Sequence, residues 1–300
     1  MKEGLTVALW ATRLSYPVKS LKSWAALVEK KIIEAKESGA EILLMPEYAA
    51  EQWLHFAPPG LKPVEQPAWM AQHTPDALSL LKNLVLKHRI LLISGSFPAS
   101  FPGRTPPLAN RAHIFFPDGT ILTQDKLCLT PREKNPEGWQ LSPGDDLNIF
   151  AWQGYRLCVL ICLDIELPAL SSKLAAEKVD MVFVPSMTKK LAGYHRVFDC
   201  AKARAIELQA AVAVVGVTGC APGREANISG ASFFLPCEEK FGHTGLLAHL
   251  PPSYEAAGAG ELLTAHVPLA DIRALRQNGA EAWPGVWTAS HVHINKSKNG

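Results

Sequence analysis

Short apolar runs that alternate with amphipathic segments constrain the fold of this chain more than any other feature of its sequence. Residues 18–38 carry apolar side chains at helical spacing and predict a helix with one buried face. A β-hairpin is expected over 112–124, with its turn at 117–120. Strands that alternate with helices, interrupted by hairpins, predict one layered α/β domain with a mixed sheet or a pair of sheets. The runs with the length and composition of buried strands are 5–9, 41–45, 90–94, 157–161, 181–184 and 211–217.

A second helix is expected to begin at Thr74-Pro75, because threonine is a good N-cap and proline suits the first helical turn. Apolar residues at helical spacing continue to about Arg89. The proline-rich segment 57–75 before it is expected to be a long surface loop.

The composition suits a large folded core, with 300 residues that are 48% hydrophobic and 19% charged. The 30 basic side chains nearly balance 28 acidic ones without runs of like charge, which argues against a nucleic-acid or membrane-surface partner. No apolar segment approaches the ~18 residues of a membrane span, and the first residues lack the apolar core of a signal peptide. We therefore expect a cytoplasmic protein with one domain over residues 1–300, of which 278–300 form a tail available to pack on a partner subunit.

The six cysteines lie at irregular spacings in a chain without an export signal, so we expect reduced thiols. No CxxC pair and no His/Cys group has the spacing of zinc ligands. The sequence therefore predicts neither a metal site nor a cofactor.

Three reactive side chains each follow a predicted strand. Glu47 follows the run 41–45, Lys126 follows the hairpin, and Cys162 follows the run 157–161. Taken singly, each has an ordinary explanation: a carboxylate exposed where a strand leaves the core, a lysine that protects a sheet edge, and a buried thiol. Strand ends converge on ligand clefts in layered folds, however, so we expect the three to meet.

Together these side chains suit acyl transfer from an amide or a nitrile. The thiol would attack the carbonyl or nitrile carbon and the carboxylate would take the thiol proton. The cation would raise the thiolate fraction and stabilise the negative oxygen that develops.

The segments around these residues resemble the three signature blocks of the nitrilase superfamily of carbon–nitrogen hydrolases: 45–47, 125–127 and 161–164. The resemblance extends over nearly the whole chain and includes 141–145 and 203–207. It implies a four-layer αββα sandwich, a homodimer or larger homo-oligomer, and a small-molecule amide or nitrile as substrate.

Position by position, the resemblance makes Glu47 the general base, Lys126 the oxyanion-stabilising cation and Cys162 the nucleophile. The backbone N–H of Leu163 would also bind the oxyanion. The residues expected to contact the substrate are Tyr48, Trp139 and Met187. Two positions depart from the family pattern: Leu163 stands where a tyrosine is usual, and Ala169 where a glutamate is frequent.

Two glutamates in one loop are candidates for a further catalytic carboxylate. Glu133 lies between Arg132 and Lys134, which is typical of a solvated loop. Glu137 precedes Gly138 and Trp139, so a turn and a buried indole beside it are expected to raise its pKa. The segment 137–139 also resembles the loop that bears a further catalytic glutamate in amidases of the superfamily. The sequence therefore predicts Glu137 as the catalytic residue and Glu133 as a surface residue.

The leading functional hypothesis is an amidase that cleaves a small carboxamide to an acid and ammonia or an amine through a cysteine thioester. A true nitrilase is the close alternative, and the sequence does not separate the two. A catalytically silent binding scaffold remains a third hypothesis. The absence of a CxxC pair disfavours a thiol redox protein.

Overall fold

Two six-stranded sheets face each other in the computed structural model, which describes residues 2–281 and 289–294. The first sheet has the order β12-β1-β2-β3-β4-β5 and the second the order β11-β10-β9-β8-β7-β6. The strands of the first sheet are β1 (Leu5–Thr12), β2 (Ile42–Leu44), β3 (Leu91–Ser100), β4 (Leu108–Phe115), β5 (Ile121–Asp125) and β12 (Gly260–Val267). Those of the second are β6 (Ile149–Trp152), β7 (Tyr155–Val159), β8 (Met181–Ser186), β9 (Ala211–Gly216), β10 (Ser229–Phe234) and β11 (Leu246–Ser253).

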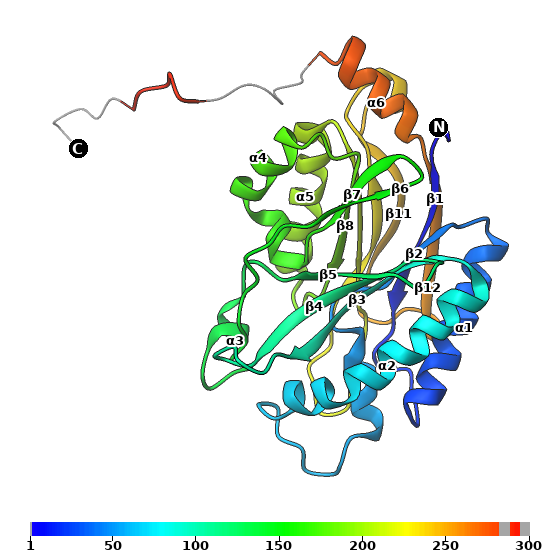
Figure 1. Ribbon diagram of the computed structural model, residues 1–300, viewed down its shortest axis with the longest axis vertical. Helices are drawn as coiled ribbons and strands as arrows, with labels where there is room; N and C mark the ends of the chain where they lie inside the picture. The colour runs from blue at the N-terminus through cyan, green and yellow to red at the C-terminus, as the bar shows by residue number, and fades with distance from the viewer. Residues whose placement is uncertain (1, 282–288, 295–300) are drawn as a thin grey trace.

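Helices cover the outer face of each sheet, so the molecule has the αββα layers expected from the sequence (Figure 1). On the first sheet lie α1 (Leu21–Glu37) and α2 (Gln66–His88); on the second lie α4 (Pro168–Ala176) and α5 (Leu191–Leu208). The remaining helices are α3 (Pro131–Lys134), α6 (Leu269–Asn278) and the 3₁₀ turns η1 (Ala49–Phe56), η2 (Cys162–Glu166) and η3 (Glu239–Phe241).

The central strands are apolar on both faces because both faces are buried. In β1, the side chains of Leu5, Val7 and Leu9 belong to the core between the sheets, whereas Ala8 and Trp10 belong to the core under α1 and α2. This alternation follows from the two-residue period of a strand. The central strands β1, β2 and β3 are parallel, as are β7, β8 and β9, so the ends of β2 and β7 can carry functional groups out of the core.

The expected start of the second helix at Thr74-Pro75 is wrong, because α2 already begins at Gln66 and Pro75 lies inside it. Pro67 occupies the first turn instead. Met70 is fully buried in the core under the helix, so packing of the apolar face extends the helix ahead of Pro75. The hydroxyl of Thr74 donates hydrogen bonds to the carbonyls of Met70 and Pro98 rather than capping a helix.

Within the described residues, no helix combines the length and hydropathy that crossing a bilayer requires. Most of the predicted tail over 278–300, including Trp283 and Trp287, lies outside the described residues.

Candidate active site

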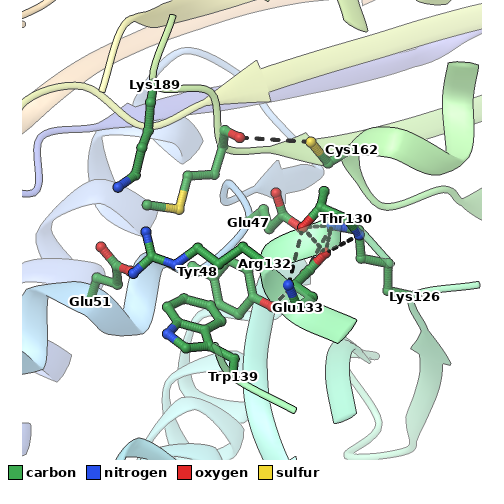
Figure 2. A pocket seen from close by; sticks show the side chains of 11 residues that line it. Glu47, Tyr48, Glu51, Lys126, Thr130, Arg132, Glu133, Trp139, Cys162 and Lys189 are labelled. Atoms are coloured by element: carbon green, nitrogen blue, oxygen red, sulfur yellow. Dashed lines mark hydrogen bonds and ion pairs between the residues drawn. The ribbon is translucent and has the colours of Figure 1, made fainter. Parts of the chain in front are cut away.

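The three predicted reactive groups meet at one end of the paired sheets. Glu47 follows β2, Lys126 follows β5, and Cys162 follows β7 as the first residue of η2. The Nζ of Lys126 donates a hydrogen bond of 2.8 Å to Oε1 of Glu47. All three side chains line one cavity, in which Cys162 faces the Glu47–Lys126 pair (Figure 2). At 6% or less exposure, each is almost sealed from bulk solvent.

The backbone of Cys162 is left-handed, with φ +51°, an unusual conformation for a residue that is not glycine. It occurs at the sharp turn between β7 and η2, and such strain concentrates where a functional side chain must be held at a defined angle. The Sγ atom lies 3.7 Å from the carbonyl oxygen of Met187, which follows the neighbouring strand β8. The thiol is therefore presented from a rigid element.

Asp164 joins the cysteine turn to the lysine segment. Its fully buried carboxylate accepts backbone hydrogen bonds from Ile161 (3.1 Å), Leu127 (3.2 Å) and Cys128 (2.7 Å). Burial raises the pKa of Asp164 to about 6, although the three N–H donors oppose that rise. Asp164 thus sets the position of Cys162 relative to Lys126.

The charged groups of the site perturb one another strongly. Burial raises the pKa of Glu47 to about 7, the positive charge of Lys126 opposing that rise and the negative charge of Glu133 adding to it. Burial alone would lower the pKa of Lys126, but the two neighbouring carboxylates raise it above its usual range. Burial and the charge of Glu47 raise the pKa of the Cys162 thiol well above its ordinary value. The resting site therefore holds a neutral thiol beside a carboxyl group that can exchange a proton near neutral pH.

The expectation that Glu133 is a solvated surface residue is wrong. It is only 3% exposed, and its carboxylate binds Lys126 Nζ at 2.8 Å and the Tyr48 hydroxyl at 2.6 Å. It also accepts hydrogen bonds from the side chain of Asn110 and from the backbone N–H and hydroxyl of Thr130. Burial alone would raise the pKa of Glu133, but Lys126 and these donors hold it below its ordinary value.

Glu137 lies outside this cavity, exposed to solvent beside the outer face of Trp139. The prediction that Glu137 lies beside Cys162 is therefore wrong, and Glu133 occupies the position that was expected of Glu137. The physical reason is local, because Thr130 caps α3 and Glu133, three residues later, completes a capping box that turns its carboxylate inward. The pattern Thr130-x-x-Glu133 was the sequence signal that could have found it.

The cavity has a volume of about 160 Å³, and the predicted contact residues Tyr48, Trp139 and Met187 all line it. The rings of Tyr48 and Trp139 pack edge to face with centroids 4.7 Å apart. Leu163 lines a second cavity of about 250 Å³ that also reaches Cys162. Sequence reasoning missed four further residues of the first cavity: Glu51, Thr130, Arg132 and Lys189. Within residues 2–281 and 289–294, no cluster of three or more His, Cys, Asp or Glu side chains could hold a metal ion.

The chain is similar to known proteins over most of its length. The family model described as "Carbon-nitrogen hydrolase" matches residues 11–277. The "Probable hydrolase YhcX" of Bacillus subtilis is 29% identical over 265 residues, which cover 87% of this chain and 50% of that protein. This chain thus spans about half the length of that relative.

A deaminated glutathione amidase of Synechocystis is 24% identical over 233 residues, covering 73% of this chain and 79% of that protein. Among solved structures, the amidase from Nesterenkonia sp. AN1 in complex with butyramide superimposes with a TM-score of 0.68, at 21% identity over 93% of this chain and 98% of that one. The match of the family model over nearly the whole chain identifies the protein as a member of the carbon–nitrogen hydrolase family.

Proposed function

We propose that the protein is a cysteine-dependent amidase that cleaves a small carboxamide to an acid and ammonia or an amine. The observation that carries this proposal is the buried Glu47–Lys126–Glu133 cluster beside the Cys162 thiol. Several similar proteins are amidases, which supports an amide rather than a nitrile as the substrate of this chain.

In the proposed first step, Glu47 takes the thiol proton while Sγ of Cys162 attacks the amide carbon. The carbonyl oxygen becomes an oxyanion, which the ammonium of Lys126 and the backbone N–H of Leu163 stabilise. When this intermediate collapses, protonated Glu47 gives its proton to the nitrogen, the carbon–nitrogen bond breaks, and a thioester remains on Cys162.

In the second step, Glu47 takes a proton from a water molecule, which attacks the thioester carbon. When this second intermediate collapses, the carbon–sulfur bond breaks and the acid leaves, and protonated Glu47 returns the proton to the Cys162 thiolate. A carboxyl group with a pKa of about 7 suits both directions of proton transfer near neutral pH.

Glu133 serves as a positioning residue in this scheme. It holds Lys126 through a 2.8 Å ion pair, and its negative charge adds to the burial that raises the pKa of Glu47 to about 7. It also fixes the ring of Tyr48 on the cavity wall through the hydroxyl.

A panel of small amides and nitriles, read by ammonia release, tests the proposal. We expect turnover of amides, loss of turnover in Cys162→Ala, and an acyl adduct on Cys162 detectable by mass spectrometry of the intact protein. Cys220→Ala is the matched control, because Cys220 does not line the cavity. Amide turnover that survives in Cys162→Ala would contradict the mechanism, and turnover of nitriles alone would favour a nitrilase.

We also propose, from the family resemblance, that the chain forms a homodimer or larger homo-oligomer to which residues 278–300 contribute. Light scattering on the whole chain and on a chain that ends at residue 277 tests this proposal. A whole chain that remains monomeric at assay concentration would contradict it.

A further inference from the structure

The end of the cavity away from Lys126 carries positive charge that the proposed chemistry does not use. We propose that the substrate is a carboxamide whose far end carries a carboxylate, the monoamide of a short dicarboxylic acid, and that Arg132 and Lys189 bind this carboxylate. This inference rests on the proposed amidase function and names the substrate class for it.

Three separate elements supply the residues at this end. Glu51 comes from η1, Arg132 from α3, and Lys189 from the segment after β8. All three line the same cavity as Cys162. Figure 2 shows Glu51 and Lys189 on the opposite side from Lys126 and Glu133, with the Arg132 side chain extending from beside Glu133 toward Glu51.

Glu51 does not make this end acidic, because Arg224 neutralises it. Nη2 of Arg224 lies 3.1 Å from Oε1 of Glu51, and both side chains are at most 4% exposed. The Cζ atoms of Arg224 and Arg132 lie 5.3 Å and 5.1 Å from the ring centroid of Trp139, so the indole helps to position both guanidinium groups.

The remaining charges at this end are positive. Among the described residues, Arg132 forms no ion pair with a carboxylate, although it is close enough to lower the pKa of Glu51. Lys189 pairs with Glu225 at 3.1 Å, but the Glu225 side chain is 81% exposed, and such surface pairs contribute little. A substrate carboxylate would receive charge-assisted hydrogen bonds here, whereas an ammonium group would face two cations.

One further atom points to a ligand at this end. Oε2 of Glu51 is buried and has no hydrogen-bond partner among the described residues. A buried acceptor without a donor is costly, so a donor on the bound substrate, such as a hydroxyl group beside its carboxylate, would complete it. The volume of about 160 Å³ suits the short chain of such a substrate.

Three amides of matched length test the inference: the monoamide of glutaric acid, hexanamide and 5-aminopentanamide. They place an anionic, a neutral and a cationic group, respectively, at the same distance from the amide. We expect kcat/KM for the anionic amide to exceed that for hexanamide at least about tenfold, equivalent to about 1.4 kcal/mol. This ratio should fall as salt screens the charges. Equal or greater kcat/KM for hexanamide or the cationic amide would overturn the inference while leaving the amidase function intact.

Substitutions of Arg132 and Lys189 test whether these two residues cause the preference for the anionic amide. Arg132→Met and Lys189→Met should each lower the anionic-to-neutral ratio of kcat/KM severalfold, mainly by raising KM for the anionic amide. Lys134→Met is the matched control, because Lys134 is an exposed cation on the same short helix that does not line the cavity. If Lys134→Met lowers the ratio as much as Arg132→Met, the preference comes from general surface charge and the assignment is wrong.

A binding measurement separates this inference from the amidase proposal. If no amide is hydrolysed, the proposed function fails, and protection of Cys162 from iodoacetamide then decides about the carboxylate site. Protection by the glutaric monoamide at concentrations where hexanamide gives none supports the site. Equal protection by both compounds, or by neither, overturns it.

Discussion

Replacing Glu133 by Gln removes one negative charge from a cluster that is almost sealed from solvent. The Glu133 carboxylate accepts hydrogen bonds from the Lys126 ammonium, the Tyr48 hydroxyl, the Asn110 amide and Thr130. A glutamine has one acceptor oxygen, and its NH₂ group would face donors that need an acceptor. Lys126 would retain only Glu47 as a buried anionic partner.

The expected loss of unfolding free energy is large because the Lys126–Glu133 ion pair is buried: both side chains are at most 4% exposed. Removing one partner of a buried ion pair costs about 3–5 kcal/mol. We therefore expect Glu133→Gln to lower the free energy of unfolding by about that amount, as measured by urea denaturation. Glu137→Gln is the matched control and should change it by less than about 0.5 kcal/mol, because Glu137 is exposed.

Kinetics distinguish a positioning role of Glu133 from a merely structural one. Its charge raises the pKa of Glu47, so its removal should lower that pKa and shift the acidic limb of the kcat/KM profile below pH 7. The kcat of Glu133→Gln should fall strongly, whereas that of Glu137→Gln should remain near the wild-type value. If Glu137→Gln loses more kcat than Glu133→Gln, or if the acidic limb does not move, the reasoning is wrong.

Four further predictions follow from the same site. Lys126→Met should lose at least about 10²–10³ in kcat, the usual cost of one oxyanion-stabilising donor; a near-normal kcat would reduce Lys126 to a structural role. Wild-type kcat/KM should rise with pH through a midpoint of about 7, since Glu47 must be deprotonated to act as the base; a profile flat from pH 5 to 8 would contradict that assignment. Asp164→Asn should cost about 1.5–3 kcal/mol in urea denaturation, because an amide cannot accept all three backbone hydrogen bonds, and it should also slow alkylation of Cys162; unchanged stability would contradict the proposed tie between the two segments. Activity should survive exhaustive dialysis against EDTA, whereas loss that only added zinc reverses would point to metal-assisted hydrolysis.

The sequence by itself predicted the layered architecture and the three side chains that meet in the cavity. Apolar runs of strand length, separated by amphipathic helices, leave few ways to bury both faces of the strands. Glu47, Lys126 and Cys162 each lie within three residues of a strand end. The resemblance of the segments around them to the signature blocks of the nitrilase superfamily singled them out as the predicted reactive residues. The apolar runs and the residues near strand ends are local patterns, so predictions made from them stay valid when a predicted strand or helix boundary is wrong by a few residues.

The tertiary structure decided which glutamate joins these three groups. Glu133 and Glu137 lie four residues apart, and flanking charges made Glu133 resemble a surface residue. The outcome depends on the inward turn of α3 and on contacts with Tyr48 and Asn110, which are 85 and 23 residues distant in the chain. Similarly, the charged end of the cavity exists only because Glu51, Arg132 and Lys189 converge from separate elements. The capping-box pattern Thr130-x-x-Glu133 records part of the first outcome, but the convergence of Glu51, Arg132 and Lys189 depends on how the segments between elements pack, which no local pattern in the sequence records.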